Sequence, residues 1–292
     1  MGSPKDSNSS GVFVTPRLVD GKYRLGRVIG EGGMGAVFEA EHVGLGIKVA
    51  VKLLNDLFTD ENNAVSRFRR EARAAAAVRH QNVVAVTDTG TDHDGTPFIV
   101  MELLEGESLS SVLRRQKLFS PFIATDIACQ ILSGLSAAHE KKVIHRDLKP
   151  GNILLTQSSE GGWLVKILDF GISKTFFSEG HLSQVTATGA VVGTPRFMAP
   201  EQASGKADLD GRVDIYAVGV LLYRMVTGKL PFSGKTNDEV MRQIVENDII
   251  RPSEICPFID YRLERVILKA MATDRNQRYQ TADDFMRELK ET

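Results

Sequence analysis

The residues best suited to chemistry lie in one short stretch, His145-Arg146-Asp147-Leu148-Lys149-Pro150-Gly151-Asn152. Asp147 can accept a proton from a hydroxyl group, and Asn152, five positions later, offers a hard oxygen of the kind that Mg²⁺ prefers. Lys149 places a positive charge between them, where a transferring phosphoryl group would need one. A charged turn with a capping aspartate would explain an isolated His-Arg-Asp, but it does not explain the whole eight-residue string.

A glycine-rich segment, Gly30-Glu31-Gly32-Gly33-Met34-Gly35, lies near the N-terminus. Because glycine has no Cβ, its backbone N–H group can approach phosphate oxygens closely. The residues that follow alternate as in a strand, whereas a dinucleotide-binding loop would open a helix here. A plain hairpin turn is the alternative, so these glycines indicate a phosphate site only together with other motifs.

Lys52 ends an apolar predicted strand, Val49-Ala50-Val51-Lys52. A lysine in such a place is unfavourable unless its ammonium group has a partner. Glu71 follows 19 residues later, in a stretch rich in Ala and Arg that is predicted to be helical. A Lys52–Glu71 pair between strand and helix would direct the ammonium group toward nucleotide phosphates. Taken singly, each residue is as well explained as a surface lysine or an ordinary acid on a helix face.

A second carboxylate stands in Asp169-Phe170-Gly171, 22 residues after Asp147. With Asn152 it would offer two oxygen ligands to Mg²⁺, which usually takes one or two protein oxygens and completes its shell with nucleotide phosphates. The residues from 172 to 198 show little periodicity and many Ser, Thr and Gly, so we expect a long functional or disordered loop there.

The elements that must position these groups follow from the hydrophobic pattern. Strands are predicted at 23–30, 36–41, 47–53, 83–89, 98–102, 143–144 and 153–155. Helices are predicted at 107–115, 121–140, 236–246, 259–270 and 281–289. Strands therefore dominate the first part and helices the second, with a boundary near 103–106.

With these motifs in this order, the chain resembles the eukaryotic-like protein kinases over about residues 22–290. The eight-residue string matches their catalytic loop, and Asp169 opens their Asp-Phe-Gly motif. Lys149 is typical of the Ser/Thr class, and the segment from Gly193 to Gln202 is most similar to bacterial members.

This resemblance implies an α+β, two-lobe protein kinase fold. Residues 1–20 would form a disordered tail, 21–104 a β-rich N-lobe with one main helix, and 105–292 a mainly helical C-lobe. The two lobes together would make one kinase domain, 21–290.

The resemblance implies transfer of the γ-phosphoryl group of Mg-ATP to Ser/Thr of protein substrates, with autophosphorylation of the activation loop. ATP and Mg²⁺ are the expected cofactors, with Mn²⁺ as an alternative metal. A pseudokinase-type nucleotide-binding scaffold is the alternative function. It would require the loss of Lys52, Asp147 or Asp169, and none is lost.

The roles of individual residues are carried over from the same resemblance. The catalytic set is Asp147, Lys149, Asn152, Lys52 and Glu71. The metal ligands are Asn152 and Asp169. The ATP-binding set is Ile29, Gly30, Gly32, Gly33, Gly35, Val37, Ala50, Lys52, Met101, Glu102, Leu104 and Leu154. Thr194 would face the protein substrate. Structural roles fall to Arg146, to Asp214 at the start of a central helix, and to a Glu201–Arg278 pair.

The same resemblance places two phosphorylation sites, Thr186 and Thr188, in the activation loop. Arg146, Lys174 and Arg67 would face one pocket and repel each other without an anion. A phosphothreonine carries about −1.5 to −2 charge at neutral pH, so it would neutralise this pocket and order the loop.

Composition restricts the remaining possibilities. The net charge of −1 gives no electrostatic reason to expect nucleic-acid binding. No apolar run reaches the ~18 residues of a membrane helix, and the N-terminus is polar and unlike a secretory signal. The two cysteines, Cys129 and Cys256, form no Cys-x-x-Cys motif. We therefore expect a cytoplasmic domain, free or tethered by a longer parent, that acts on protein substrates and self-associates for trans-autophosphorylation.

Overall fold

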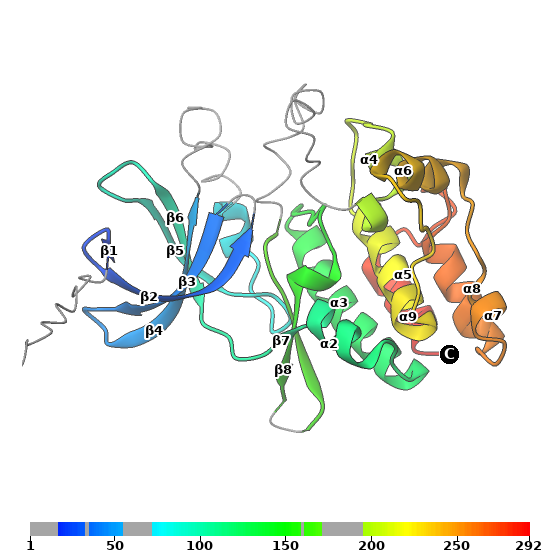
Figure 1. The fold of residues 1–292 in the computed structure, drawn as a ribbon, viewed down its shortest axis with the longest axis horizontal. Helices are drawn as coiled ribbons and strands as arrows, with labels where there is room; N and C mark the ends of the chain where they lie inside the picture. The colour runs from blue at the N-terminus through cyan, green and yellow to red at the C-terminus, as the bar shows by residue number, and fades with distance from the viewer. Residues whose placement is uncertain (1–16, 33–34, 55–71, 159–160, 171–194) are drawn as a thin grey trace, which may run out of the picture.

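The computed structural model describes residues 17–32, 35–54, 72–158, 161–170 and 195–292. Within these ranges the chain forms a β-rich small lobe followed by a larger, mainly helical lobe, shown from left to right in Figure 1. The predicted two-lobe α+β arrangement is therefore confirmed.

The small lobe is built on an antiparallel sheet in which the described strands take the order β1-β2-β3-β4-β6-β5. Their bounds are Leu18–Val19, Tyr23–Gly32, Gly35–His42, Ile47–Leu54, Pro97–Glu102 and Val86–Thr91 in that order. Strands β4 and β6 consist mainly of buried apolar residues, because each has a neighbouring strand on both sides. Val51, Phe98 and Val100 are almost fully buried and form the centre of one of the lobe's clusters.

The first strand corrects the predicted disordered tail, which was expected to extend to residue 20. Val19 is fully buried, and Leu18 and Val19 pair with β2. The Arg17 guanidinium donates to Asp92 at 2.8 Å and to Asp94 at 2.7 Å, in the turn between β5 and β6. Apolar burial and these ion pairs order the chain from Arg17 onward; residues 1–16 lie outside the described ranges.

The start of β5 differs from the predicted strand at 83–89, because the strand begins only at Val86. The segment before it pairs with another sheet. Val84 N donates to Ile167 O at 2.9 Å, and Ile167 N donates to Asn82 O at 2.8 Å. The backbone groups of this segment thus bond to β9 (Trp163–Ile167) and not to β6.

The large lobe begins with a small sheet in the described order β7-β8-β9, formed by Glu107–Ser108, Ile153–Gln157 and Trp163–Ile167. The predicted helix at 107–115 was wrong at its start, since Glu107 and Ser108 pair with β8. Helix α2 covers Leu109–Gln116 because the Ser108 side chain accepts a hydrogen bond from Ser111 N and caps it.

The predicted strand at 143–144 does not form. Val143 N donates to Ala138 O at 3.0 Å and closes the end of helix α3, so it cannot enter a ladder. The residues that follow turn instead toward helix α5, where His145 N is bound by a side chain.

Helices α3 and α5 form the centre of the large lobe (Figure 1). After α2, the large lobe contains the helices α3 Pro121–Glu140, α4 Pro200–Ala203, α5 Arg212–Thr227, α6 Asn237–Glu246, α7 Pro252–Ile255, α8 Tyr261–Ala270 and α9 Ala282–Leu289. Short 3₁₀ turns, η2 Pro150–Asn152 and η5 Pro195–Phe197, precede β8 and α4. Of the described helices, α3 alone is long and apolar enough to cross a membrane by length and composition, and half of its most apolar window is buried in the protein.

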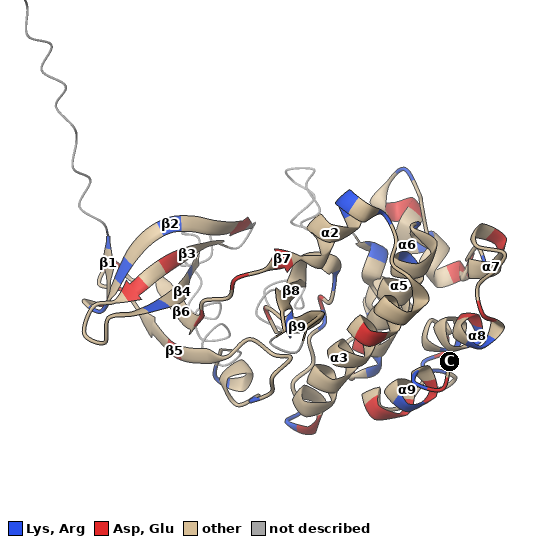
Figure 2. Cartoon of the chain, turned by 90° about the horizontal axis from the view of Figure 1, so that it is seen from below, with Lys and Arg blue, Asp and Glu red and all other residues tan. Residues whose placement is uncertain are grey.

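Ion pairs connect helices α8 and α9. Lys269 of α8 donates to Glu288 of α9 at 2.6 Å, and Arg265 reaches the same carboxylate at 3.3 Å. Figure 2 shows acidic and basic positions mixed along α9. Such exposed pairs add little stability each, so the apolar faces of these helices provide most of the contact energy.

Candidate active site

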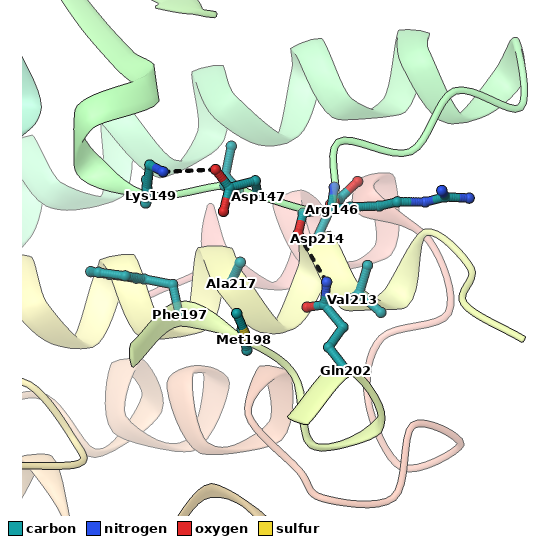
Figure 3. A pocket seen from close by; sticks show the side chains of 10 residues that line it. Arg146, Asp147, Lys149, Phe197, Met198, Gln202, Val213, Asp214 and Ala217 are labelled. Carbon is teal, nitrogen blue, oxygen red and sulfur yellow. Dashed lines mark hydrogen bonds and ion pairs between the residues drawn. The ribbon is translucent and has the colours of Figure 1, made fainter. Parts of the chain in front are cut away.

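Asp147 lies at the centre of the predicted catalytic loop, with the other polar groups of that loop around it. Lys149 Nζ donates to Asp147 Oδ2 at 2.7 Å. Asn152 Nδ2 donates to the Asp147 carbonyl oxygen at 2.8 Å. The structure therefore brings together the acid, the amine and the carboxamide that the sequence placed on one loop. Figure 3 shows the contact between Lys149 and Asp147.

The backbone just before Asp147 is held in an unusual conformation. Arg146 has a φ of 64°, in the left-handed region that few residues other than glycine adopt. Asp214 of α5 holds this turn, since Oδ1 accepts from Arg146 N at 2.8 Å and Oδ2 accepts from His145 N at 2.9 Å. Asp214, for which a structural role at the start of a central helix was predicted, thus contacts the catalytic loop.

Asp214 is itself buried, with 1% of the residue exposed. His139, in the last turn of α3, places its Nε2 atom 2.8 Å from Asp214 Oδ2. Burial would raise the pKa of Asp214, but the hydrogen bonds that it receives from the His139 side chain and the His145 amide hold this pKa below its ordinary value. Asp214 therefore remains an ionised acceptor for the loop amides.

His145 links the loop to the segment that follows β9 and leads into Asp169. Its Nε2 atom lies 2.8 Å from Leu168 O, which can only accept, so Nε2 carries a proton. Its Nδ1 atom accepts from Asp147 N at 3.2 Å, so Nδ1 does not. The neutral tautomer with the proton on Nε2 satisfies both contacts and joins the amide of Asp147 to residue 168.

Lys52 and Asp169 meet between the lobes. Lys52 Nζ donates to Asp169 Oδ1 at 2.7 Å, and Lys52 is 8% exposed. Burial would raise the pKa of Asp169, but the charge and hydrogen bond of Lys52 hold it below the ordinary value. The carboxylate is therefore ionised at neutral pH. Glu71, the predicted partner of Lys52, lies outside the described residues.

The two predicted metal ligands occupy adjacent segments. Leu168 N donates to Asn152 O at 2.9 Å, which ties the residue before Asp169 to the catalytic loop. Asn152 commits its Nδ2 atom to Asp147 O, which leaves the amide oxygen as its remaining polar atom. A neutral oxygen and an ionised carboxylate fit Mg²⁺, and Mn²⁺ would accept the same donors. Among the described residues no cluster of three or more His, Cys, Asp or Glu could hold a metal, so any ion here would depend on further ligands from a nucleotide.

Most residues of the predicted adenine pocket pack together. Ala50 and Met101 belong to one buried cluster, and Val37 and Leu104 pack against it. Leu154 is half-buried on β8 of the other sheet, and Ile29 is 40% exposed on β2. The cluster is therefore an apolar patch at the boundary of the two lobes.

The side chain of Glu102, a residue of the predicted ATP-binding set, bonds to other parts of the protein. Its Oε1 atom accepts from Lys166 Nζ at 2.8 Å and from Ala85 N at 2.8 Å. The side chain is thus directed toward β9 and residue 85, and the backbone N–H of Glu102 donates to Ala85 O at 3.0 Å.

The described part of the glycine-rich segment forms the ends of β2 and β3. Gly32 pairs with Gly35. A Cβ on Gly35 would collide with the carbonyl oxygen of Leu53, so this position cannot carry a side chain without movement of β4. A Cβ on Gly30 would meet its nearest atom, in the Val37 side chain, at an ordinary contact distance of 3.8 Å. Gly33 lies outside the described residues.

The predicted Glu201–Arg278 pair forms in the core of the large lobe. Two parallel bonds of 2.7 Å join the guanidinium to the carboxylate, and the two side chains are 0% and 5% exposed for Arg278 and Glu201. Arg278 also donates to backbone oxygens of Ala272, Arg212 and Thr273. All five of its N–H donors therefore have acceptors.

Two residues of the site were missed by sequence reasoning. His139 contacts Asp214, and Gln202 of α4 donates to the Arg146 carbonyl at 2.9 Å. A histidine at a helix end next to the catalytic loop could have been noticed. A glutamine in a four-residue helix carries no signal in its residue type. Thr186, Thr188 and Thr194 lie outside the described residues.

Comparison with known proteins agrees with this geometry. Residues 23–289 match the family described as "Protein kinase domain". The chain is 40% identical over 279 residues to a probable serine/threonine-protein kinase PknB of Corynebacterium glutamicum, covering 93% of this chain and 42% of that protein. It is also 40% identical to the serine/threonine-protein kinase Pkn1 of Myxococcus xanthus, covering 92% of this chain and 38% of that protein. The chain thus spans less than half the length of these relatives.

The fold agrees with solved structures as well. A crystal structure of the Mycobacterium tuberculosis PknI kinase domain superposes with a TM-score of 0.73 at 25% identity, covering 95% of this chain and 98% of that one.

Proposed function

Because this chain belongs to the protein kinase domain family, we propose that it transfers the γ-phosphoryl group of ATP to serine and threonine hydroxyls of proteins. The observation that carries the proposal is the arrangement of Asp147, Lys149 and Asn152 on one loop, tied through Leu168 to Asp169. A scaffold that only binds nucleotide would have no need for an acid held in a loop whose backbone is strained at Arg146 and fixed by Asp214.

Each residue has a role that follows from its contacts. Asp147 accepts the proton of the acceptor hydroxyl as the new O–P bond forms and the bond to the leaving ADP oxygen breaks. Lys149, 2.7 Å from that carboxylate, supplies positive charge beside the transferred group. Lys52 is placed by Asp169 to face nucleotide phosphates, with Glu71 proposed as its second partner.

Asn152 and Asp169 would hold Mg²⁺, or Mn²⁺ in its place. When bound, the ion neutralises charge on the phosphate oxygens and orients them. The protein's own contribution is to keep Asp169 ionised through Lys52 and to aim the oxygen of Asn152 through its bond to Asp147.

The choice of acceptor is the first prediction. Purified protein incubated with radiolabelled Mg-ATP and a library of peptides should yield phosphoserine and phosphothreonine, because Lys149 and the proposed Thr194 leave a short reach to Asp147. Phosphoamino-acid analysis measures this. Phosphotyrosine as the main product would contradict the Ser/Thr assignment, and no product at all would favour the pseudokinase alternative.

Activation by phosphorylation of Thr186 and Thr188 is a further part of the proposal. Arg146 supports it: its guanidinium Nε is buried and, within the described residues, has no hydrogen-bond partner. Part of this cation is thus buried without a partner, so a neighbouring anion would stabilise it, and a phosphothreonine would provide one. Two copies of the chain would associate transiently to phosphorylate each other.

The second prediction concerns these threonines. Thr186→Ala/Thr188→Ala should lose at least about tenfold in kcat/KM on an external peptide, since a charge-assisted contact is worth about 1.5–3 kcal/mol. Arg146→Asn should show a matching loss; Asn tolerates the left-handed backbone, so it removes the cation without adding strain. The parent, treated with phosphatase, is the control. Activity of the double variant within twofold of the phosphorylated parent would refute activation by phosphorylation of Thr186 and Thr188.

We propose a cytoplasmic location for this domain, where ATP and protein substrates are available. In the described part of the chain, Cys129 and Cys256 are free thiols, as a reducing compartment would keep them.

A further inference from the structure

The peptide group between Arg146 and Asp147 is held at both of its polar atoms. Its carbonyl oxygen accepts from Gln202 Nε2 at 2.9 Å, and its N–H donates to His145 Nδ1 at 3.2 Å. This group immediately precedes the Cα atom of Asp147. Its orientation therefore determines where the Asp147 side chain starts and in which direction it points.

Gln202 makes its contact from helix α4, which is fixed to the core of the large lobe. The preceding residue, Glu201, is locked into the core by its two bonds to Arg278. The Gln202 Oε1 atom accepts from Ala199 N at 3.1 Å, at the start of α4. One amide orientation alone serves both contacts, because Ala199 N must donate and Arg146 O must accept. Figure 3 shows the Gln202 side chain directed from α4 toward Arg146.

We propose that Gln202 is a positioning residue that couples the segment 195–203 to the catalytic Asp147. Of the side chains bound to the Arg146 backbone in the described structure, Asp214 comes from the central helix α5 and Gln202 from the segment that follows the activation loop. A shift of that segment would release the Arg146 carbonyl and let the peptide group before Asp147 rotate. This inference rests on the proposed role of Asp147 in phosphoryl transfer.

The chemistry of the amide allows its two bonds to be separated. Gln202→Glu keeps an oxygen for Ala199 N but replaces the donor to Arg146 O with a carboxylate oxygen. Gln202→Met has a similar length and keeps neither bond. We expect kcat on a peptide substrate to fall roughly tenfold in both variants, as for the loss of one hydrogen bond to a buried carbonyl. The KM for ATP should stay within about twofold, because no nucleotide-facing group is changed.

The midpoint of thermal unfolding provides the second readout. Both variants lose the bond to Arg146 O and should unfold below the parent, but Gln202→Glu should lose less, since it keeps the cap of α4. Gln243→Glu is the matched control. Gln243 Oε1 also accepts a hydrogen bond from a backbone amide, that of Ser233, at 3.1 Å. Gln243 lies on α6, however, and none of its described hydrogen bonds involves the catalytic loop. Its kcat should match the parent.

The outcomes separate this inference from the proposed function. An inactive parent would contradict the proposed function itself. With an active parent, a Gln202→Glu variant that keeps normal kcat would overturn the positioning role. So would a kcat that falls only in step with the unfolding temperature, because that pattern shows a structural role alone. An equal kcat loss in Gln202→Glu and Gln202→Met, at different unfolding temperatures and unchanged ATP affinity, would establish it.

Discussion

Replacing Asp147 with asparagine is expected to lower kcat at least about 100-fold, as for the loss of a general base. Asparagine has the same shape but cannot accept the proton of the acceptor hydroxyl. The backbone carbonyl of residue 147 still accepts from Asn152, and its amide still donates to His145, so the loop should keep its conformation. Binding of ATP should therefore change by less than about twofold.

Steady-state kinetics with a peptide substrate measure kcat, and a fluorescent nucleotide measures affinity. Asp126→Asn on the exposed face of α3 is the control, and it should behave as the parent. Asp169→Asn should differ from both, because it removes a proposed metal ligand and the partner of Lys52, and so weakens binding of Mg-ATP as well. Near-normal turnover of Asp147→Asn would contradict the proposal that Asp147 accepts the proton of the acceptor hydroxyl.

Elements with strong local signals were predicted accurately from the sequence. Helix α3 was placed at its observed bounds because Ser120 caps it, proline occupies its first position, and apolar residues recur with a helical period. Strands β3 and β4 were placed to within one residue because both alternate or run apolar between turn glycines.

The errors arose where tertiary contacts decide the local structure. Val143 and Ile144 have a strand-like composition, but Val143 N closes α3. Glu107 was assigned to a helix because helix formers follow it, yet pairing with Leu155 of β8 keeps it extended. In both cases the deciding partner lies elsewhere in the fold, so local sequence could not reveal it.

The same distinction applies to the site. Asp147, Asn152 and Asp169 were predictable because few roles explain these residue types at these spacings. The contact of Gln202 with the Arg146 carbonyl was not, since it depends on how α4 is set against the catalytic loop. The position of α4 depends in turn on the Glu201–Arg278 pair, whose two residues lie 77 positions apart in the sequence.

That pair should be essential to the stability of the large lobe. Glu201→Gln keeps the shape of the side chain but leaves the Arg278 guanidinium buried without a countercharge. Breaking a buried ion pair in this way destabilises proteins by about 3–5 kcal/mol. We expect a loss of this size in the free energy of unfolding, measured by chemical denaturation. Arg242→Gln is the control, because its pair with Glu246 is exposed and is worth about 0.5 kcal/mol or less.

A second substitution tests the physical reason for the loss. If the uncompensated charge is responsible, Arg278→Met in the Glu201→Gln background should recover part of the stability, because it removes the buried cation. Recovery will be incomplete, since Arg278 also donates to the carbonyl oxygens of Ala272, Arg212 and Thr273. Additive losses in the double variant would show that these backbone contacts, and not the pairing of charges, make Arg278 important. A Glu201→Gln variant as stable as Arg242→Gln would show that the buried pair contributes no more than a surface one.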